Sequence, residues 1–118
     1  LNIIDPRKII VSVEHIIDKL QKELQTEFSS GGTLGLYIHI CCLIERMVTN
    51  KNYLDDIKYE FDKDRYPQFS LIKDILSEIE QLYKVELPNK EIVYLIDYIN
   101  ANRSCTSNTV NSNDLFEM

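Results

Sequence analysis

The sequence predicts an all-α protein, a compact bundle of about five helices. Apolar residues recur at steps of three and four along most of the 118 residues, which is the period of an amphipathic helix. Only three glycines and three prolines are present, so long continuous elements are favoured. Hydrophobic residues make up 44% of the chain and charged residues 27%, a composition typical of a globular domain rather than a disordered one.

The first expected helix covers residues 6–28. Asp5 is a suitable N-cap, and Pro6 suits the first helical position because its missing N–H has no partner to lose there. The apolar face comprises Ile9, Ile10, Val13, Ile16, Ile17, Leu20 and Leu24. The sequence "SSGG" at 29–32 predicts a short turn that ends this helix.

The second expected helix covers residues 33–50 and is apolar over most of its circumference. A helix of this kind is typically the central one, surrounded by the others. It is interrupted by His39, Glu45 and Arg46 and is short for a membrane span, so no membrane contact is expected.

Three more helices are expected in the second half, over residues 54–64, 67–83 and 89–102. From residue 103 the sequence becomes rich in Ser, Asn and Thr, which bury too little apolar surface to order a chain. The expected organisation is therefore a helical domain over residues 1–102 and a flexible tail over residues 103–118.

Charge and composition argue against several classes of function. The net charge is −6, whereas a nucleic-acid-binding domain usually presents a basic face, so direct nucleic-acid contact is not expected. The odd cysteine count and the absence of a signal peptide predict free thiols in the cytoplasm. The sequence has no Gly-rich phosphate loop and no nucleophile elbow, and Cys41 and Cys42 point about 100° apart on a helix. No enzymatic activity, metal or cofactor is therefore expected.

His39 is the residue that calls for an explanation, because it interrupts the apolar second helix. On a helix it shares a face with Leu43 and Arg46. An imidazole can accept a phosphoryl group, and a guanidinium is a natural partner for the resulting phosphate. From spacing alone, a packed core histidine with Arg46 at the surface is the favoured interpretation, ahead of a phosphate site. His15, at the edge of an amphipathic stripe, favours a structural role.

Two stretches together resemble a known family. "GLYIHICCLIERM" at 35–47 is similar to the central motif of the PTS regulation domain (PRD), in which an apolar helix carries a histidine and, seven positions later, an arginine. "RYPQFSLIKDILSEIEQLYKVELPNKEIVYLIDYI" at 65–99 is similar to the second half of the same domain. The resemblance covers roughly residues 4–102. "LNIIDPRKII" and "HICCLIERM" most resemble the C-terminal PRD of LevR-type, sigma-54-dependent transcriptional activators.

The resemblance implies a helical bundle, often a homodimer, in a cytoplasmic bacterial regulator of sugar-utilisation genes. His39 would be phosphorylated by a phosphotransferase-system protein, HPr or a sugar-specific EIIB, and Arg46 would lie beside the phosphate. The phosphorylation state would modulate the activity or dimerisation of the regulator. AAA+ and DNA-binding domains would lie in the rest of a full-length chain.

One departure from the family pattern concerns the last helix. Many PRDs carry a second histidine there, where "EIVYLIDYI" has Tyr98, preceded by Asp97. A tyrosine cannot replace histidine in this relay, so a single phosphosite is expected, with Asp97 and Tyr98 near the phosphate. Three alternatives stay open: a dimerisation module without a working phosphosite, the PRD of a BglG-type antiterminator, and a histidine phosphotransfer protein.

Overall fold

The computed structural model describes residues 5–49 and 60–108, with side chains described as far as Arg103. The described residues form α-helices and one short 3₁₀ helix and contain no strand, which confirms the all-α prediction. The elements are α1 (Pro6–Leu24), α2 (Ser30–Thr49), the 3₁₀ helix η2 (Lys63–Arg65), α3 (Phe69–Tyr83) and α4 (Asn89–Asn108).

The end of α1 and the start of α2 differ from the sequence prediction. α1 begins as expected, because the Asp5 side chain accepts a hydrogen bond from the Arg7 N–H at 3.0 Å. It ends at Leu24 rather than residue 28, because Gln25 adopts the left-handed conformation with φ 53° and ψ 52°. The chain then turns inward, and Phe28 is buried in the core.

The prediction of a turn at 29–32 is wrong, because residues 30–32 form the first turn of α2. The Ser29 hydroxyl accepts a hydrogen bond from the Gly32 N–H at 3.0 Å, which is the contact of an N-cap. This cap provides a partner for one of the backbone N–H groups that the first turn of a helix leaves unpaired. α2 therefore starts at Ser30, within the "SSGG" stretch that local preference assigns to a turn.

The helix expected over residues 54–64 is not found in the part that the structure describes. Residues 60–62 are not helical, η2 follows as one 3₁₀ turn, and residues 54–59 lie outside the described ranges. The Phe61 ring packs on Phe69 with centroids 4.6 Å apart, so tertiary packing holds this segment as a connection to α3. The described residues thus contain four α-helices, and the expected count of five is too high.

The last helix extends further than the sequence predicts. α4 starts at Asn89 as expected but continues to Asn108, past the expected domain limit at residue 102. The Arg103 guanidinium donates a hydrogen bond at 3.1 Å to the Leu24 carbonyl at the end of α1, one of the carbonyls that a helix terminus leaves without an intrahelical partner. The division into a domain over 1–102 and a tail over 103–118 stays a prediction.

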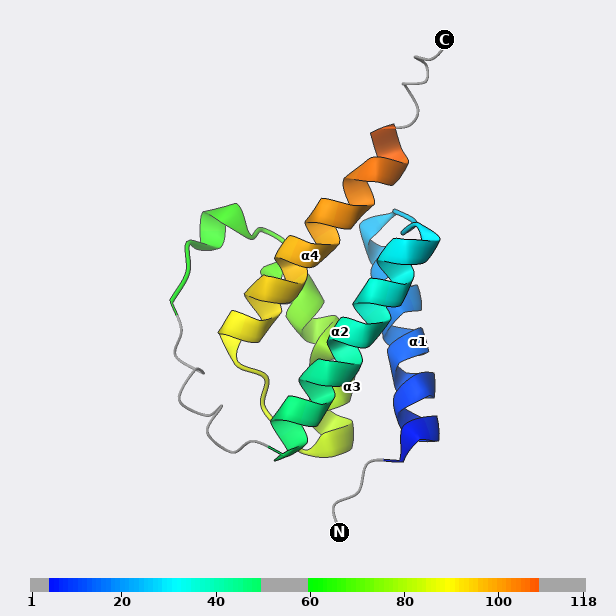
Figure 1. The fold of residues 1–118 in the computed structure, drawn as a ribbon. Helices are drawn as coiled ribbons and strands as arrows, with labels where there is room; N and C mark the ends of the chain where they lie inside the picture. Colours follow the sequence, from blue (N-terminus) through cyan, green and yellow to red (C-terminus); the bar gives the residue numbers. More distant parts are fainter. Residues whose placement is uncertain (1–4, 50–59, 109–118) are drawn as a thin grey trace.

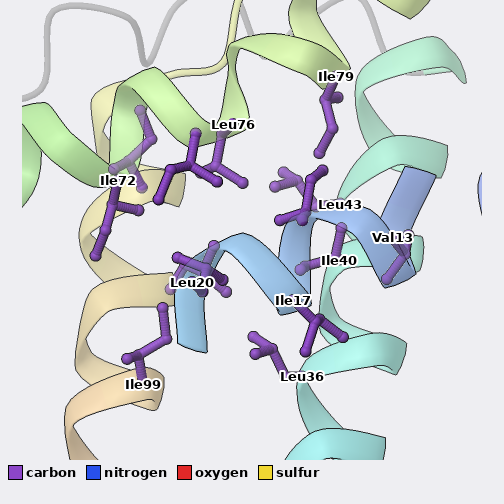
Figure 2. Close-up of a cluster of buried hydrophobic side chains, with 14 of the residues drawn as sticks. Val13, Ile17, Leu20, Leu36, Ile40, Leu43, Ile72, Leu76, Ile79 and Ile99 are labelled. Carbon is purple, nitrogen blue, oxygen red and sulfur yellow. The ribbon is translucent and has the colours of Figure 1, made fainter. Parts of the chain in front are cut away.

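The helices are arranged so that α1 contacts α2 and α3, while α4 contacts the same two helices from the other side. α2 lies between α1 and α4 and runs antiparallel to both (Figure 1). Figure 2 shows side chains of all four helices meeting in the core. The labelled core residues are Val13, Ile17, Leu20, Leu36, Ile40, Leu43, Ile72, Leu76, Ile79 and Ile99.

By length and composition alone, α2 is the helix among the described residues that could cross a membrane. Its fold context gives a different reason for its apolarity, because Leu36, Ile40, Leu43 and Ile44 are fully buried against the neighbouring helices. One side of α2 thus packs into the core, whereas Leu34 and Ile38 on its other side are more than half exposed, so the prediction that the other helices surround it is wrong.

Candidate functional site

The candidate site lies along the contact between α2 and α4. Three contacts fix the antiparallel register: Gly32 faces Asn102, the His39 ring faces the Tyr98 ring, and Arg46 pairs with Glu91. Arg46 and Glu91 are separated by 45 residues in the sequence. Helix packing therefore assembles this row of polar side chains from two distant segments.

The middle of this row holds His39 and Tyr98. Their ring centroids are 5.9 Å apart and the rings are tilted by 49°. The Tyr98 hydroxyl donates a hydrogen bond to the Gly32 carbonyl at 3.2 Å. Gly35 makes this position possible, because a Cβ atom on that residue would overlap the Tyr98 hydroxyl. The tyrosine is thus held in a notch on α2, with its ring beside a partly exposed imidazole.

At the far end of the row, the Arg46 Nη2 atom donates a hydrogen bond to Glu91 Oε1 at 2.8 Å. The Glu91 side chain is 7% exposed, whereas that of Arg46 is 39% exposed. A short charge-assisted hydrogen bond of this kind offsets part of the cost of burying the carboxylate. Arg46 is therefore a partly exposed cation held in place by a buried acid.

Burial and charge together hold His39 in its neutral form. Burial lowers the pKa of His39 below its ordinary value of 6.5, the Arg46 guanidinium lowers it further, and the Glu91 carboxylate acts in the opposite direction. At neutral pH the imidazole is therefore uncharged and keeps a nitrogen lone pair. A neutral, partly exposed imidazole with a cation nearby suits nucleophilic attack on an anionic group.

Asp97 makes a different contact from its neighbour Tyr98. Its exposed carboxylate accepts hydrogen bonds from the Tyr66 hydroxyl at 3.1 and 3.3 Å. This contact joins α4 to the segment that leads into α3. The structure therefore connects Asp97 with Tyr66, and its closeness to a phosphate stays a prediction.

The cysteines offer a poor alternative site. Cys41 is half-buried, and burial raises the pKa of its thiol, with Cys42 as a second cause. A raised pKa lowers the fraction of reactive thiolate. Within residues 5–49 and 60–103, no group of three or more His, Cys, Asp or Glu side chains could hold a metal ion.

His15 occupies a separate contact between α1 and α3. Its Nδ1 atom lies 2.8 Å from Glu78 Oε1, and the His15 side chain is 55% exposed. This contact joins two helices at the surface and includes none of the α2 and α4 residues described above. It agrees with the structural role that its sequence context favours.

Sequence reasoning missed Glu91 and Gly35 as parts of the site. A signal was present for the first, because Glu91, Leu95 and Tyr98 follow steps of four and three and so share one helix face. On α2, Gly32, Gly35, His39 and Arg46 follow the corresponding steps. What the sequence did not show is that these two faces meet.

A second surface feature lies between α1 and α2. A groove of about 580 Å³ is lined by Pro6, Ile9, Ile10, Tyr37, Cys41, Cys42, Glu45 and Thr49. Tyr37 also borders a neighbouring groove that includes Leu34. Val11, Leu34 and Ile38 are more than half exposed on the same two helices. These helices therefore present apolar surface to solvent.

Comparison with known proteins gives one family match and one curated relative. The family model of the PRD domain matches residues 14–102, a range that contains His39, Arg46, Glu91 and Tyr98. Over 99 residues the chain is 27% identical to the transcriptional regulatory protein DagR of Salmonella typhimurium (strain 14028s / SGSC 2262). The match covers 84% of this chain but only 11% of that protein's length. No solved structure gives a significant match.

Proposed function

Because this chain belongs to the PRD domain family, we propose that it is a regulatory domain of a bacterial transcriptional regulator controlled by the phosphotransferase system, with His39 as its phosphoryl acceptor. One observation carries the assignment to this residue. His39 is a partly exposed imidazole on α2, its pKa is lowered by burial and by Arg46, and it lies within the matched range. The domain signals and does not catalyse a reaction of its own.

The proposed transfer uses the neutral form of His39. A ring nitrogen lone pair attacks the phosphorus atom of a phosphohistidine or phosphocysteine on the donor protein. A P–N bond forms on His39, while the donor P–N or P–S bond breaks and returns its electron pair to the donor atom. A histidine that carried a proton on both nitrogens could not attack, so the lowered pKa favours the reaction at neutral pH.

The residues around His39 have distinct roles in this proposal. Arg46 is placed to neutralise part of the charge on the phosphohistidine, because guanidinium groups bind phosphate with paired N–H donors. Tyr98 stands where many members of the family have a second histidine, and its hydroxyl is already hydrogen-bonded to Gly32. The chain therefore has one acceptor in this region, with Tyr98 and Asp97 as neighbours.

The resemblance to LevR-type activators supports a more specific placement. In that setting the chain is part of a sigma-54-dependent regulator whose AAA+ and DNA-binding domains lie elsewhere, and HPr or an EIIB protein of the cytoplasm is the donor. The curated relative is a transcriptional regulatory protein several times longer than this chain, which agrees with a multidomain setting. A BglG-type antiterminator is the second setting.

The apolar surface of α1 and α2 supports a homodimer. Val11, Leu34 and Ile38 are exposed there and flank the grooves around Tyr37. Exposed apolar patches of this kind mark interaction surfaces, and the family implies a second copy as the occupant. The same surface is the observation that favours the alternative function, a dimerisation module in which His39 only packs.

Intact mass spectrometry tests the assignment directly. The chain is incubated with phosphoenolpyruvate, Enzyme I, HPr and candidate EIIB proteins, alongside His39→Ala and the matched control His15→Ala. We expect one added phosphate on the wild type and on His15→Ala, and none on His39→Ala. A folded wild-type chain that gains no phosphate from any donor contradicts the proposal and leaves the dimerisation module as the better function.

A further inference from the structure

Glu91 differs from every other acidic residue whose side chain the structure describes, because it is buried. The relative exposure of Glu91 is 5%. Among all polar and charged residues whose side chains are described, the other buried one is the uncharged Ser12. A buried carboxylate is costly unless charges or hydrogen bonds compensate it. Glu91 therefore calls for a physical reason, and the structure offers two.

The first reason is Arg46, whose guanidinium lies 2.8 Å from the Glu91 carboxylate. The second is position, because Glu91 lies in the first turn of α4, where the helix dipole favours negative charge. Its backbone N–H donates to the Pro88 carbonyl at 3.0 Å, and its neighbours Ile92 and Val93 are buried. The side chain is thus held in a closely packed first turn.

We propose that Glu91 is the resting partner of Arg46, that phosphate on His39 displaces it, and that the first turn of α4 carries the phosphorylation signal. This inference rests on the proposed function, because it requires phosphorylation of His39. It adds a regulatory role for Glu91 and names the element that responds.

Geometry places the phosphate within reach of Arg46. Arg46 follows His39 by seven residues, a rise of about 10 Å along the helix axis. A long side chain on a helix points back toward the N-terminus, so the guanidinium extends toward His39. Besides burial, the Arg46 guanidinium lowers the pKa of the imidazole and the Glu91 carboxylate raises it, which agrees with this arrangement.

A phosphoryl group adds a charge of about −1.5 to −2 and three acceptor oxygens. It attracts the Arg46 guanidinium and repels the Glu91 carboxylate. Once Arg46 turns toward the phosphate, Glu91 is a buried charge that has lost this partner, so it moves to solvent or takes up a proton. Either change disturbs the packing of the first turn of α4.

The contacts toward the opposite end of the α2–α4 contact involve no charged group. There the Tyr98 hydroxyl donates to the Gly32 carbonyl at 3.2 Å, and Gly32 faces Asn102, so a charge on His39 leaves these contacts intact. The expected change is therefore an opening of α2 and α4 at the end that holds Arg46 and Glu91, with the end at Gly32 unmoved.

The test is an NMR comparison of the 118-residue chain before and after phosphorylation, with side-chain carboxyl and backbone amide resonances assigned. We expect the Glu91 carboxyl and the amides of residues 89–94 to shift, whereas the Glu78 carboxyl beside His15 stays in place. A chain that mass spectrometry shows to be phosphorylated on His39, but whose Glu91 carboxyl does not move, overturns the inference and leaves the proposed function intact. A chain without phosphate on His39 overturns both.

A pair of variants sharpens the result. Glu91→Gln removes the buried charge, and Glu86→Gln removes one charge from an exposed residue just before α4. We expect Glu91→Gln to hold several-fold more phosphate at equilibrium than Glu86→Gln, and its α4 amides to respond weakly to phosphorylation. Equal behaviour of the two variants overturns the inference. If Glu91→Gln does not fold, the wild-type carboxyl measurement decides the question.

Discussion

The two histidines of this chain each lie near a glutamate from another helix, yet they form different kinds of site. His15 is mostly exposed and lies 2.8 Å from Glu78. His39 is partly buried, and the nearby Glu91 is hydrogen-bonded to Arg46 instead. Burial and a third residue change the chemistry: burial lowers the pKa of the imidazole, Arg46 lowers it further, and Arg46 also pairs with the Glu91 carboxylate.

The comparison teaches that residue type alone does not identify a functional histidine. An exposed histidine–glutamate contact joins two helices and contributes little, since solvent screens it. A partly buried imidazole beside an arginine stays neutral and available for phosphoryl transfer. Four experiments test how far this difference extends, beginning with the largest expected effect.

The first experiment compares the two carboxylates. Arg46→Met leaves the buried Glu91 without its guanidinium, and we expect a loss of about 2 kcal/mol in the free energy of unfolding, below the value for a fully buried pair because Arg46 is partly exposed. His15→Ala is the control, with an expected loss below about 1 kcal/mol. Urea denaturation measures both, and equal losses would show that burial does not distinguish the two sites.

The second experiment tests the notch that holds Tyr98 beside His39. Gly35→Ala places a Cβ atom against the Tyr98 hydroxyl, and overpacking of this kind costs about 1–3 kcal/mol, of which better helix propensity returns at most about 1 kcal/mol. Gly31→Ala is the matched control on the same helix, because nothing lies within 4 Å of its new Cβ. We expect Gly31→Ala to raise the free energy of unfolding by about 0.5–1 kcal/mol, as measured by thermal denaturation. A stable Gly35→Ala would show that Tyr98 is free to move.

The third experiment removes a single hydrogen bond. Tyr98→Phe keeps the ring next to His39 but loses the bond to the Gly32 carbonyl, at a cost of about 0.5–1.5 kcal/mol. Phosphate uptake by intact mass should stay at one per chain, because the tyrosine is a neighbour of the acceptor and not an acceptor itself. Loss of phosphate uptake in a folded Tyr98→Phe chain would assign the hydroxyl a direct role.

The last and smallest effect concerns pH. Because folding lowers the pKa of His39 below 6.5, the unfolded chain binds more protons at mildly acidic pH. The stabilising contribution is complete above the unfolded pKa and is lost as pH falls through the folded pKa. Urea denaturation from about pH 7.5 to about pH 5 should therefore show a steeper loss of stability in the wild type than in His39→Gln. Parallel pH profiles would contradict the shifted pKa.

The helices themselves could be predicted from local pattern. α3 was expected at 67–83 and lies at Phe69–Tyr83, because its apolar residues repeat at helical steps and bury on one side. The turn predicted at 29–32 is wrong because the Ser29 cap starts α2 there. Of the helix predicted over 54–64, residues 60–62 are not helical, since Phe61 packs on Phe69, and residues 54–59 lie outside the described ranges.

The sequence by itself determined which residues share a helix face, including His39 with Arg46 and Glu91 with Tyr98, because helical periodicity is a local property of the chain. Only the tertiary structure decided which faces meet. Arg46 is hydrogen-bonded to Glu91, 45 residues away in the sequence, and Tyr98 is hydrogen-bonded to Gly32, 66 residues away. Such pairings depend on how the helices pack and in what register, and that depends on the whole core rather than on any one segment.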